Sequence, residues 1–184
     1  MSKSINKILI AGIIVVVIIV ALLFILPQQT KKFSYTDENI SYSFSYPKSY
    51  VVDSKTPGHI GAWLTKSDKD GKAICSIYLW LPYTEDAINT KGIENLYNAQ
   101  LKQWQNMSID LATKNLGTTN NVNINRMEGT TFEITTGELL HYSYVFKYPS
   151  KNLVGYFELV CTSTDSAIVN PAKKEFNSVL KSFN

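Results

Sequence analysis

The chain has 184 residues, of which 45% are hydrophobic and 12% aromatic, and its formal net charge is +3 at pH 7. Without Lys3 and Lys7, 16 basic residues remain against 15 acidic ones, so the rest of the chain is nearly neutral. This balance excludes the basic footprint of a nucleic-acid-binding domain and a polybasic surface for lipid headgroups.

An apolar segment from Ile8 to Leu26 opens the chain, with nineteen residues that carry no charged, amide or hydroxyl group. As a helix it would span about 28 Å, close to the hydrocarbon thickness of a bilayer. It is longer than a signal-peptide core, and no small-residue cleavage site follows it. We expect a single-pass membrane anchor within residues 1–30. Lysines flank both ends, so the shortness of the N-terminal tail leads us to expect that the following domain is exported.

The stretch ISYSFSYP, which begins at residue 40, alternates between large apolar side chains and serines, as a half-buried strand does. Burying one large side chain contributes about 1.5–3 kcal/mol, which explains an aromatic face without any ligand. We therefore predict that the larger side chains face the core and the serines face outward. The predicted core positions are Ile40, Tyr42, Phe44 and Tyr46, and the predicted outer positions are Ser41, Ser43 and Ser45.

Three further strand patterns follow, namely SYVVDS, IGAWLTK and KAICSIYLWLP. Asp70-Gly71 between the last two is a hairpin turn signal. Asp68, Asp70 and Gly71 resemble the start of a calcium loop, but the later ligands are missing and a turn is expected. The run AICSIYLWLP is apolar on both faces, which predicts a strand covered on both sides.

Two segments have helical periodicity. Residues 91–107 place apolar side chains on one wide stripe, which we expect to pack on a sheet. Near the C-terminus, Asn170 is predicted to be an N-cap and Pro171 the first helical residue. The stripes consist of Ile93, Leu96, Tyr97, Leu101 and Trp104 in the first helix, and of Phe176, Val179, Leu180 and Phe183 in the second.

Strand patterns occupy residues 109–162, with predicted turns at RMEG and SKN. In LLHYSYVFKYP, one face carries Leu140, Tyr142, Tyr144 and Phe146, and the other carries His141, Ser143 and Lys147. Strand runs interrupted by one helix and closed by another predict an α+β domain, an antiparallel sheet flanked by helices.

The two cysteines, Cys75 and Cys161, both lie at inward-facing positions of strand patterns. Two buried thiols and a disulfide, which an exported domain permits, both remain open. A reactive or metal-binding pair is disfavoured because no histidine or basic group nearby would stabilise a thiolate.

Catalytic signatures are absent from the sequence, which has no G-x-S-x-G elbow, P-loop or G-x-G-x-x-G motif. The two histidines, His59 and His141, each stand alone, whereas a zinc site needs several ligands at characteristic spacing. We expect a non-enzymatic domain without a metal or cofactor.

The opening YSFSYPKSY, the strand-rich middle and the closing AKKEFNSVLKSF resemble PsbP-like domains over about residues 33–184. This resemblance implies an antiparallel sheet flanked by helices, a fold shared with Ran-binding proteins. It implies no catalytic or binding residue at any position here. The expected function is that of a membrane-anchored extracytoplasmic module that binds a protein partner. The alternative is an exported small-ligand or metal-binding domain, lined by His141 and the aromatic groups of LYNAQLKQW.

Overall fold

The computed structural model describes residues 30–36, 40–53, 61–111 and 120–184, and the side chains of 107–111 are not described. The chain divides into two compact units, Met1–Thr30 and Lys31–Asn184. Within the described ranges no helix is both long and apolar enough to cross a membrane. The anchor predicted from Ile8 to Leu26 lies outside those ranges.

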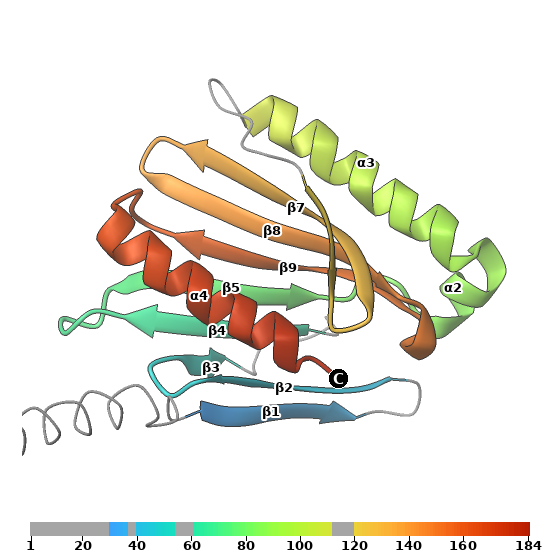
Figure 1. Ribbon diagram of the computed structural model, residues 1–184, viewed down its shortest axis with the longest axis horizontal. Coiled ribbons are helices and arrows are strands. Elements are labelled where there is room, and N and C mark those ends of the chain that lie inside the picture. The colour runs from blue at the N-terminus through green and yellow to red at the C-terminus, as the bar shows by residue number, and fades with distance from the viewer. Residues whose placement is uncertain (1–29, 37–39, 54–60, 112–119) are drawn as a thin grey trace, which may run out of the picture. The chain divides into compact units, whose positions relative to one another are not determined.

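The second unit contains two antiparallel sheets (Figure 1). The first residue of β1, Thr30, is the last residue of the first unit. β1 pairs with β2, and the seven other strands form a sheet in the order β3-β4-β5-β9-β8-β7-β6. The predicted antiparallel α+β architecture is confirmed. The strands are β1 Thr30–Thr36, β2 Ser41–Pro47, β3 Val51–Asp53, β4 Gly61–Ser67, β5 Ala73–Trp80, β6 Asn120–Ile124, β7 Met127–Thr136, β8 Leu139–Tyr148 and β9 Leu153–Cys161.

Three α-helices, α2 Glu85–Lys91, α3 Ile93–Leu111 and α4 Ser166–Ser182, and one 3-10 turn, η1 Pro149–Lys151, complete the described elements. α2 was not predicted, although Thr84 caps its N-terminus through the amide of Ala87. Gly92 follows it with a φ of 82°, a backbone conformation that favours glycine. The helix predicted over residues 91–107 corresponds to α3, which begins two residues later.

The predicted start of α4 is wrong. Asp165 is the N-cap, accepting a hydrogen bond of 2.9 Å from the amide of Ala167, and Pro171 lies inside the helix. Proline at this position lacks the amide that would continue the hydrogen-bond ladder. The additional turn buries Val169 to 6% exposure, and this burial offsets the loss of one backbone bond.

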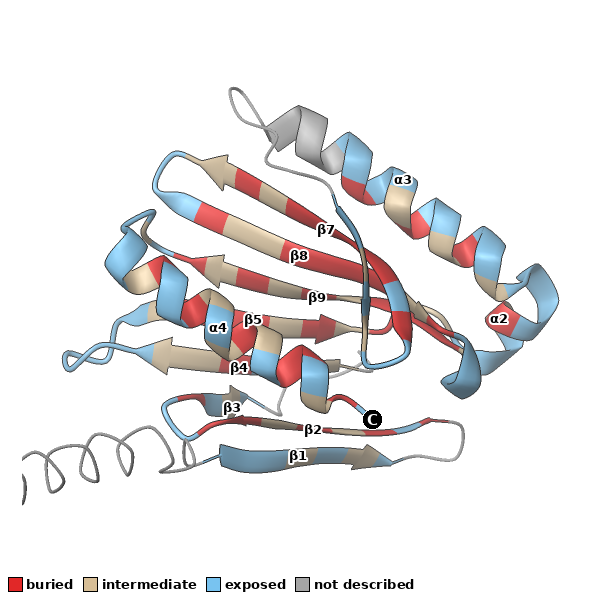
Figure 2. Cartoon of the chain, viewed as in Figure 1, coloured by how far each residue is buried: buried red, intermediate tan, exposed pale blue. Residues whose placement is uncertain are grey.

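The large sheet has a different layer on each face (Figure 2). α4 and β2 cover one face and form the main core, in which the side chains of the odd-numbered residues of β9 are buried. α3 contacts β7, β8 and β9 on the other face, where Trp104 packs against Phe132 and Tyr156. Because successive side chains of a strand point to opposite faces, each strand contributes to both layers.

β2 confirms the predicted alternation, because Ile40, Tyr42, Phe44 and Tyr46 are 2–7% exposed. The serines also contribute: Ser43 and Asn184 exchange two backbone hydrogen bonds of 2.8 and 2.9 Å. The amide of Ser45 donates to the hydroxyl of Ser182 at 2.8 Å. The C-terminal residues therefore bind along an edge of this strand, and Ser43 and Ser45 are only partly exposed.

The turns follow local signals more closely than the helix ends do. Asp68 and Lys72 close the predicted hairpin, and Gly71 has a φ of 81°. The predicted turn at RMEG is displaced, because Asn125 and Arg126, with φ values of 49° and 67°, form it. Met127 already belongs to β7 and is fully buried. β1, which is mostly polar, was not predicted and is stabilised by pairing with β2.

Replacing Phe44 with aspartate is expected to unfold the domain. The Phe44 ring stacks on Phe33 at 5.2 Å and meets Phe157 edge-on at 6.3 Å, so a carboxylate there would be buried without a partner. Thermal denaturation followed by circular dichroism should show loss of the folded transition. Ser41→Asp, on the exposed side of the same strand, is the control and should melt like the wild type. A Phe44→Asp variant with wild-type melting would contradict the core assignment.

Candidate functional site

The part of the α3-side face formed by β3, β4 and β5 is the candidate functional site, because the described helices do not cover it. Trp63 is 37% exposed and Val51 is 69% exposed, although both belong to sheet strands. The sequence predicted that β5 is covered on both sides; this is wrong for the second side, where Tyr78 and Trp80 are only half-buried. Partly exposed rings on a rigid sheet are typical of a binding surface rather than of a core.

Strand register places the residues of this surface in two parallel rows. The first row runs from Asp53 through Trp63 and Tyr78 to Glu158, each directly opposite the next on the neighbouring strand. The second row is offset by two residues along each strand. We call the two rows together the aromatic platform; the second row consists of Val51, Thr65, Ser76, Val160 and His141.

Two rings form the centre of the platform. The ring centroids of Trp63 and Tyr78 are 5.0 Å apart, with an angle of 42° between the ring planes. Such a pair offers a rigid, amphipathic contact area whose ring faces attract cations. Asp53 at one end of the row is exposed, and Glu158 lies at the other end. The aromatic centre is therefore flanked by carboxylates on both sides.

His141 joins the platform through Glu158. Its Nδ1 lies 2.8 Å from Oε1 of Glu158, and both side chains are about one-fifth exposed. This pair fixes the orientation of the carboxylate. His59 lies outside the described residues, and within the described ranges no cluster of His, Cys, Asp and Glu could hold a metal ion.

The tyrosines around Glu158 have raised pKa values. Burial is the main cause at Tyr78, with a further contribution from Glu158, and a hydrogen bond with Ser76 acts in the opposite direction. Burial, followed by the charge of Glu158, raises the pKa of Tyr156 to about 12. Both phenols are therefore neutral hydroxyl groups at physiological pH and can donate hydrogen bonds.

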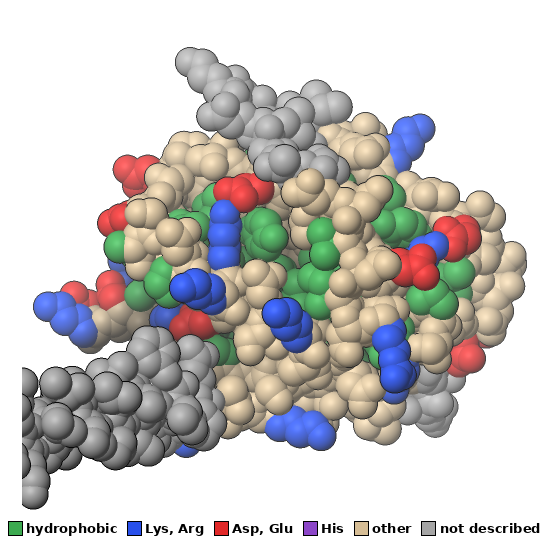
Figure 3. Space-filling model, viewed as in Figure 1, with side chains coloured by type: hydrophobic (Ala, Val, Ile, Leu, Met, Phe, Trp, Pro, Cys, Tyr) green, Lys and Arg blue, Asp and Glu red, His purple; other side chains and the backbone are tan. Residues whose placement is uncertain are grey.

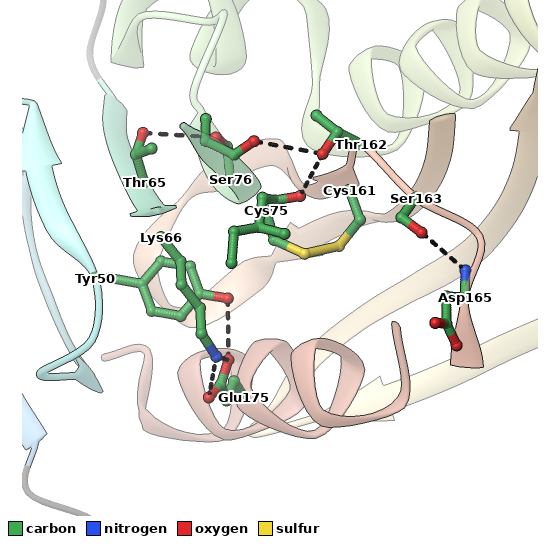
Figure 4. Close-up of a disulfide and its surroundings, with 12 residues drawn as sticks. Tyr50, Thr65, Lys66, Cys75, Ser76, Cys161, Thr162, Ser163, Asp165 and Glu175 are labelled. Carbon is green, nitrogen blue, oxygen red and sulfur yellow. Dashed lines mark hydrogen bonds and ion pairs between the residues drawn. A yellow bond between two sulfur atoms is a disulfide. The ribbon is translucent and has the colours of Figure 1, made fainter. Parts of the chain in front are cut away.

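The two cysteines lie on the opposite, α4-facing side of the sheet, where they are joined by a disulfide (Figure 4). Cys75 on β5 and Cys161 on β9 are register partners and are both buried. The bond closes a loop with a sequence separation of 86, which contributes up to about 4.5 kcal/mol by restricting the unfolded chain. Its position inside the main core indicates a structural role.

An ion pair lies beside the disulfide. Lys66 on β4 donates to both carboxylate oxygens of Glu175 on α4 at 2.9 Å, and the hydroxyl of Tyr50 donates to the same carboxylate at 3.1 Å (Figure 4). Burial, together with Glu175, raises the pKa of Tyr50 well above its ordinary value. A cavity of about 290 Å³ next to Lys66 is lined mainly by apolar residues of β5 and α4. These contacts attach α4 to the sheet.

Basic and acidic side chains both occur on the surface that carries α4 (Figure 3). Lys173 on this side pairs with Glu133 at 2.8 Å and lies 5.1 Å from the centroid of the Tyr142 ring. The mixture of signs agrees with the near-neutral composition of the domain.

The sequence indicated only parts of the platform. His141 was a candidate lining residue, and the strand pattern of IGAWLTK placed Trp63 within a strand. The aromatic groups of LYNAQLKQW, the other candidate lining, lie outside the platform: Trp104 is 2% exposed between α3 and the sheet, and Tyr97 lines a separate cavity on the α3 side. The pairing of Trp63 with Tyr78 depends on hairpin register, and that of Tyr78 with Glu158 on a long-range strand pair.

Replacing Tyr156 with phenylalanine is expected to reduce the loss of stability at alkaline pH. In the unfolded chain this phenol ionises near its ordinary pKa of 10, whereas in the folded protein its pKa is about 12. The unfolded state therefore binds fewer protons between these values, and stability falls as pH rises through this range. Denaturant unfolding near neutral pH and at about pH 11 should show a smaller difference for the variant than for the wild type. Equal losses in both proteins would contradict the assignment.

Comparisons with known proteins give a likeness in fold only. No protein-family model matches the chain, and no curated protein matches it. The Ran-binding protein Mog1p of Saccharomyces cerevisiae aligns with a TM-score of 0.50 and 7% sequence identity, over 85% of this chain and 95% of Mog1p. A Pseudomonas aeruginosa protein of unknown function, described as a candidate regulator, aligns with a TM-score of 0.49 and 13% identity, over 81% and 95% of the two chains. The chain is therefore similar to Mog1p in fold.

Proposed function

We propose that the chain is a membrane-anchored, non-catalytic, PsbP-related domain that binds a protein partner on the extracytoplasmic side through the aromatic platform. The observation that carries the proposal is the exposure of Trp63 beside Tyr78 on a sheet face without a described helix over it. Tryptophan and tyrosine are the side chains that most often dominate the binding energy of protein interfaces. Mog1p, which has a similar fold, is a Ran-binding protein, and it supports only the idea that this fold can present a protein-binding surface.

The charges of the platform define the partner more closely. Carboxylates at Asp53 and Glu158 lie at the two ends of the row that contains the rings. A lysine or arginine of the partner could stack on Trp63 while interacting with one of these carboxylates. The complementary surface is therefore a basic side chain surrounded by apolar ones. Charge complementarity of this kind mainly sets the rate of association and the choice of partner.

Trp63→Ala is expected to weaken partner binding by about 30-fold, which is typical of a central interface residue. A photoreactive residue at position 51, which belongs to the second row of the platform and is 69% exposed, would first crosslink the partner in intact membranes. The affinity of the purified partner is then measured for the wild type and for the variant. Leu139→Ala is the matched control, because Leu139 is 40% exposed and lies outside the platform.

Retention of binding by Trp63→Ala, or an equal loss in Leu139→Ala, would contradict a platform interface. Binding should also weaken when the basic residue of the partner at the crosslink is replaced by alanine. An unchanged affinity after that replacement would contradict the proposed chemistry of the partner. Thermal melting of both variants checks that the domain remains folded.

The anchor predicts that the full-length protein sediments with membranes and resists extraction by salt. Removal of residues 1–29 should release the domain, because the apolar segment is then absent. Protease added to intact cells should digest the domain if it is exported, whereas a cytoplasmic marker protein remains intact. Full-length protein that stays soluble without detergent would contradict the anchor, and a protected domain would contradict the orientation.

A further inference from the structure

A cavity of about 290 Å³ lies on the α3 side near the β6 edge of the sheet, apart from the aromatic platform. Side chains from α3, β6, β7 and β8 line it. Its volume is near the lower end of the range for small-molecule sites, so it suits a ligand of about one ring. The platform contains none of the lining residues, and the partner proposed above does not account for this cavity.

The two charged residues that line the cavity, Lys147 and Glu128, compensate one another, and Glu94 outside the lining is a second partner of Lys147. Nζ of Lys147 lies 3.1 Å from a carboxylate oxygen of Glu128, donates to Glu94 as well, and is 5.6 Å from the centroid of the Tyr97 ring. With two carboxylates beside one ammonium group, no positive charge is left to bind a phosphate or a carboxylate. The carboxylates share the ammonium group, which also disfavours a divalent cation. An uncharged ligand fits this arrangement best.

Two amide side chains provide hydrogen-bonding groups on one wall. Asn121 and Asn123 are two residues apart on β6 and therefore project from the same face of the strand. The hydroxyl of Thr130 donates to Oδ1 of Asn121 at 2.9 Å. This hydrogen bond orients the amide of Asn121 and directs its NH₂ group away from Thr130. Asn123 is exposed and has no hydrogen bond to a described residue, so it can both donate and accept.

The wall on the α3 side is less polar. Leu101 is half-buried, and Tyr97 is held in place by the contact of 3.1 Å between its hydroxyl and that of Thr130. The cavity thus combines an apolar surface from a helix with two amides from an edge strand. A pyranose ring has the matching chemistry: C–H groups on one face, and neutral hydroxyls around its rim that both donate and accept hydrogen bonds.

We propose that this cavity binds one ring of a neutral sugar, with its hydroxyls hydrogen-bonded to Asn121 and Asn123 and its C–H face against Leu101 and Tyr97. Glu128 accepts a further hydroxyl hydrogen bond. The site selects an uncharged sugar because the carboxylates of Glu94 and Glu128 neutralise the ammonium group of Lys147. The site operates independently of the partner surface, because the two share no residue.

The test is an NMR titration of the full-length chain, in a detergent without a sugar headgroup, with glucose and N-acetylglucosamine. Glucuronate and inorganic phosphate serve as charged probes. Saturable shifts with at least one neutral sugar, centred on Asn121, Asn123 and Lys147, are expected. Neither charged probe should cause comparable shifts. Titration of the wild type alone can overturn the proposal, if neither neutral sugar binds or if a charged probe binds more tightly.

Asn123→Ala should weaken binding of the sugar at least tenfold, because the substitution removes the amide that has no described partner. Asn120→Ala is the matched control: Asn120 is exposed on the same strand, points to the other face and does not line the cavity. Equal affinities in Asn123→Ala and the wild type would overturn the assignment of the amide. Retention of partner binding in Asn123→Ala would distinguish this site from the platform.

Discussion

The packing of rings around Phe157 is the interaction on which the rest of the structure depends. This fully buried side chain at the centre of β9 lies 5.1–6.5 Å, centroid to centroid, from Phe44, Phe146, Phe176 and Phe183. These rings come from β2, β8, α4 and the residue that follows α4. One buried residue thus joins the beginning, middle and end of the domain, and each favourable pair adds about 0.5–1.5 kcal/mol beyond area burial. The backbone bonds between Ser43 and Asn184 complete this closure.

The aromatic platform is a consequence of that core. Because side chains alternate along a strand, an inward Phe157 places Tyr156 and Glu158 on the opposite face. An inward Ile77 likewise places Tyr78 there. α3 contacts β7, β8 and β9 on this face, so the rings of β4 and β5 remain partly exposed. The same alternation that stabilises the domain therefore produces the surface on which the proposed function depends.

The two candidate sites lie on one face of the sheet but differ in their charge balance. On the platform, carboxylates flank aromatic rings, and a ring nitrogen of His141 lies within hydrogen-bond distance of Glu158. In the cavity near β6, Lys147 lies between Glu94 and Glu128. The first arrangement favours a cationic group on a macromolecule, and the second favours an uncharged small molecule. Both sites rest on strands whose reverse side is the main core, which makes them rigid.

Local periodicity determined much of this protein from sequence alone. The alternation in ISYSFSYP separates core from outer positions, and the alternation in β8 assigns its side chains to the two faces of the sheet. Asp70-Gly71 marks a hairpin turn, because strand and turn geometry repeat over a few residues. Tertiary structure decided the rest. α4 begins at Ser166 rather than at the predicted Pro171, because burial of an extra turn outweighs the local proline signal.

Strand order and register were likewise decided by long-range pairing. β5 lies beside β9, which brings Cys75 to Cys161 and Tyr78 to Glu158. A periodic pattern states which way a side chain points but not which strand lies next to it, because that choice depends on burying the whole core at once. The candidate site is a row of residues across several strands, and only the folded chain could assemble it.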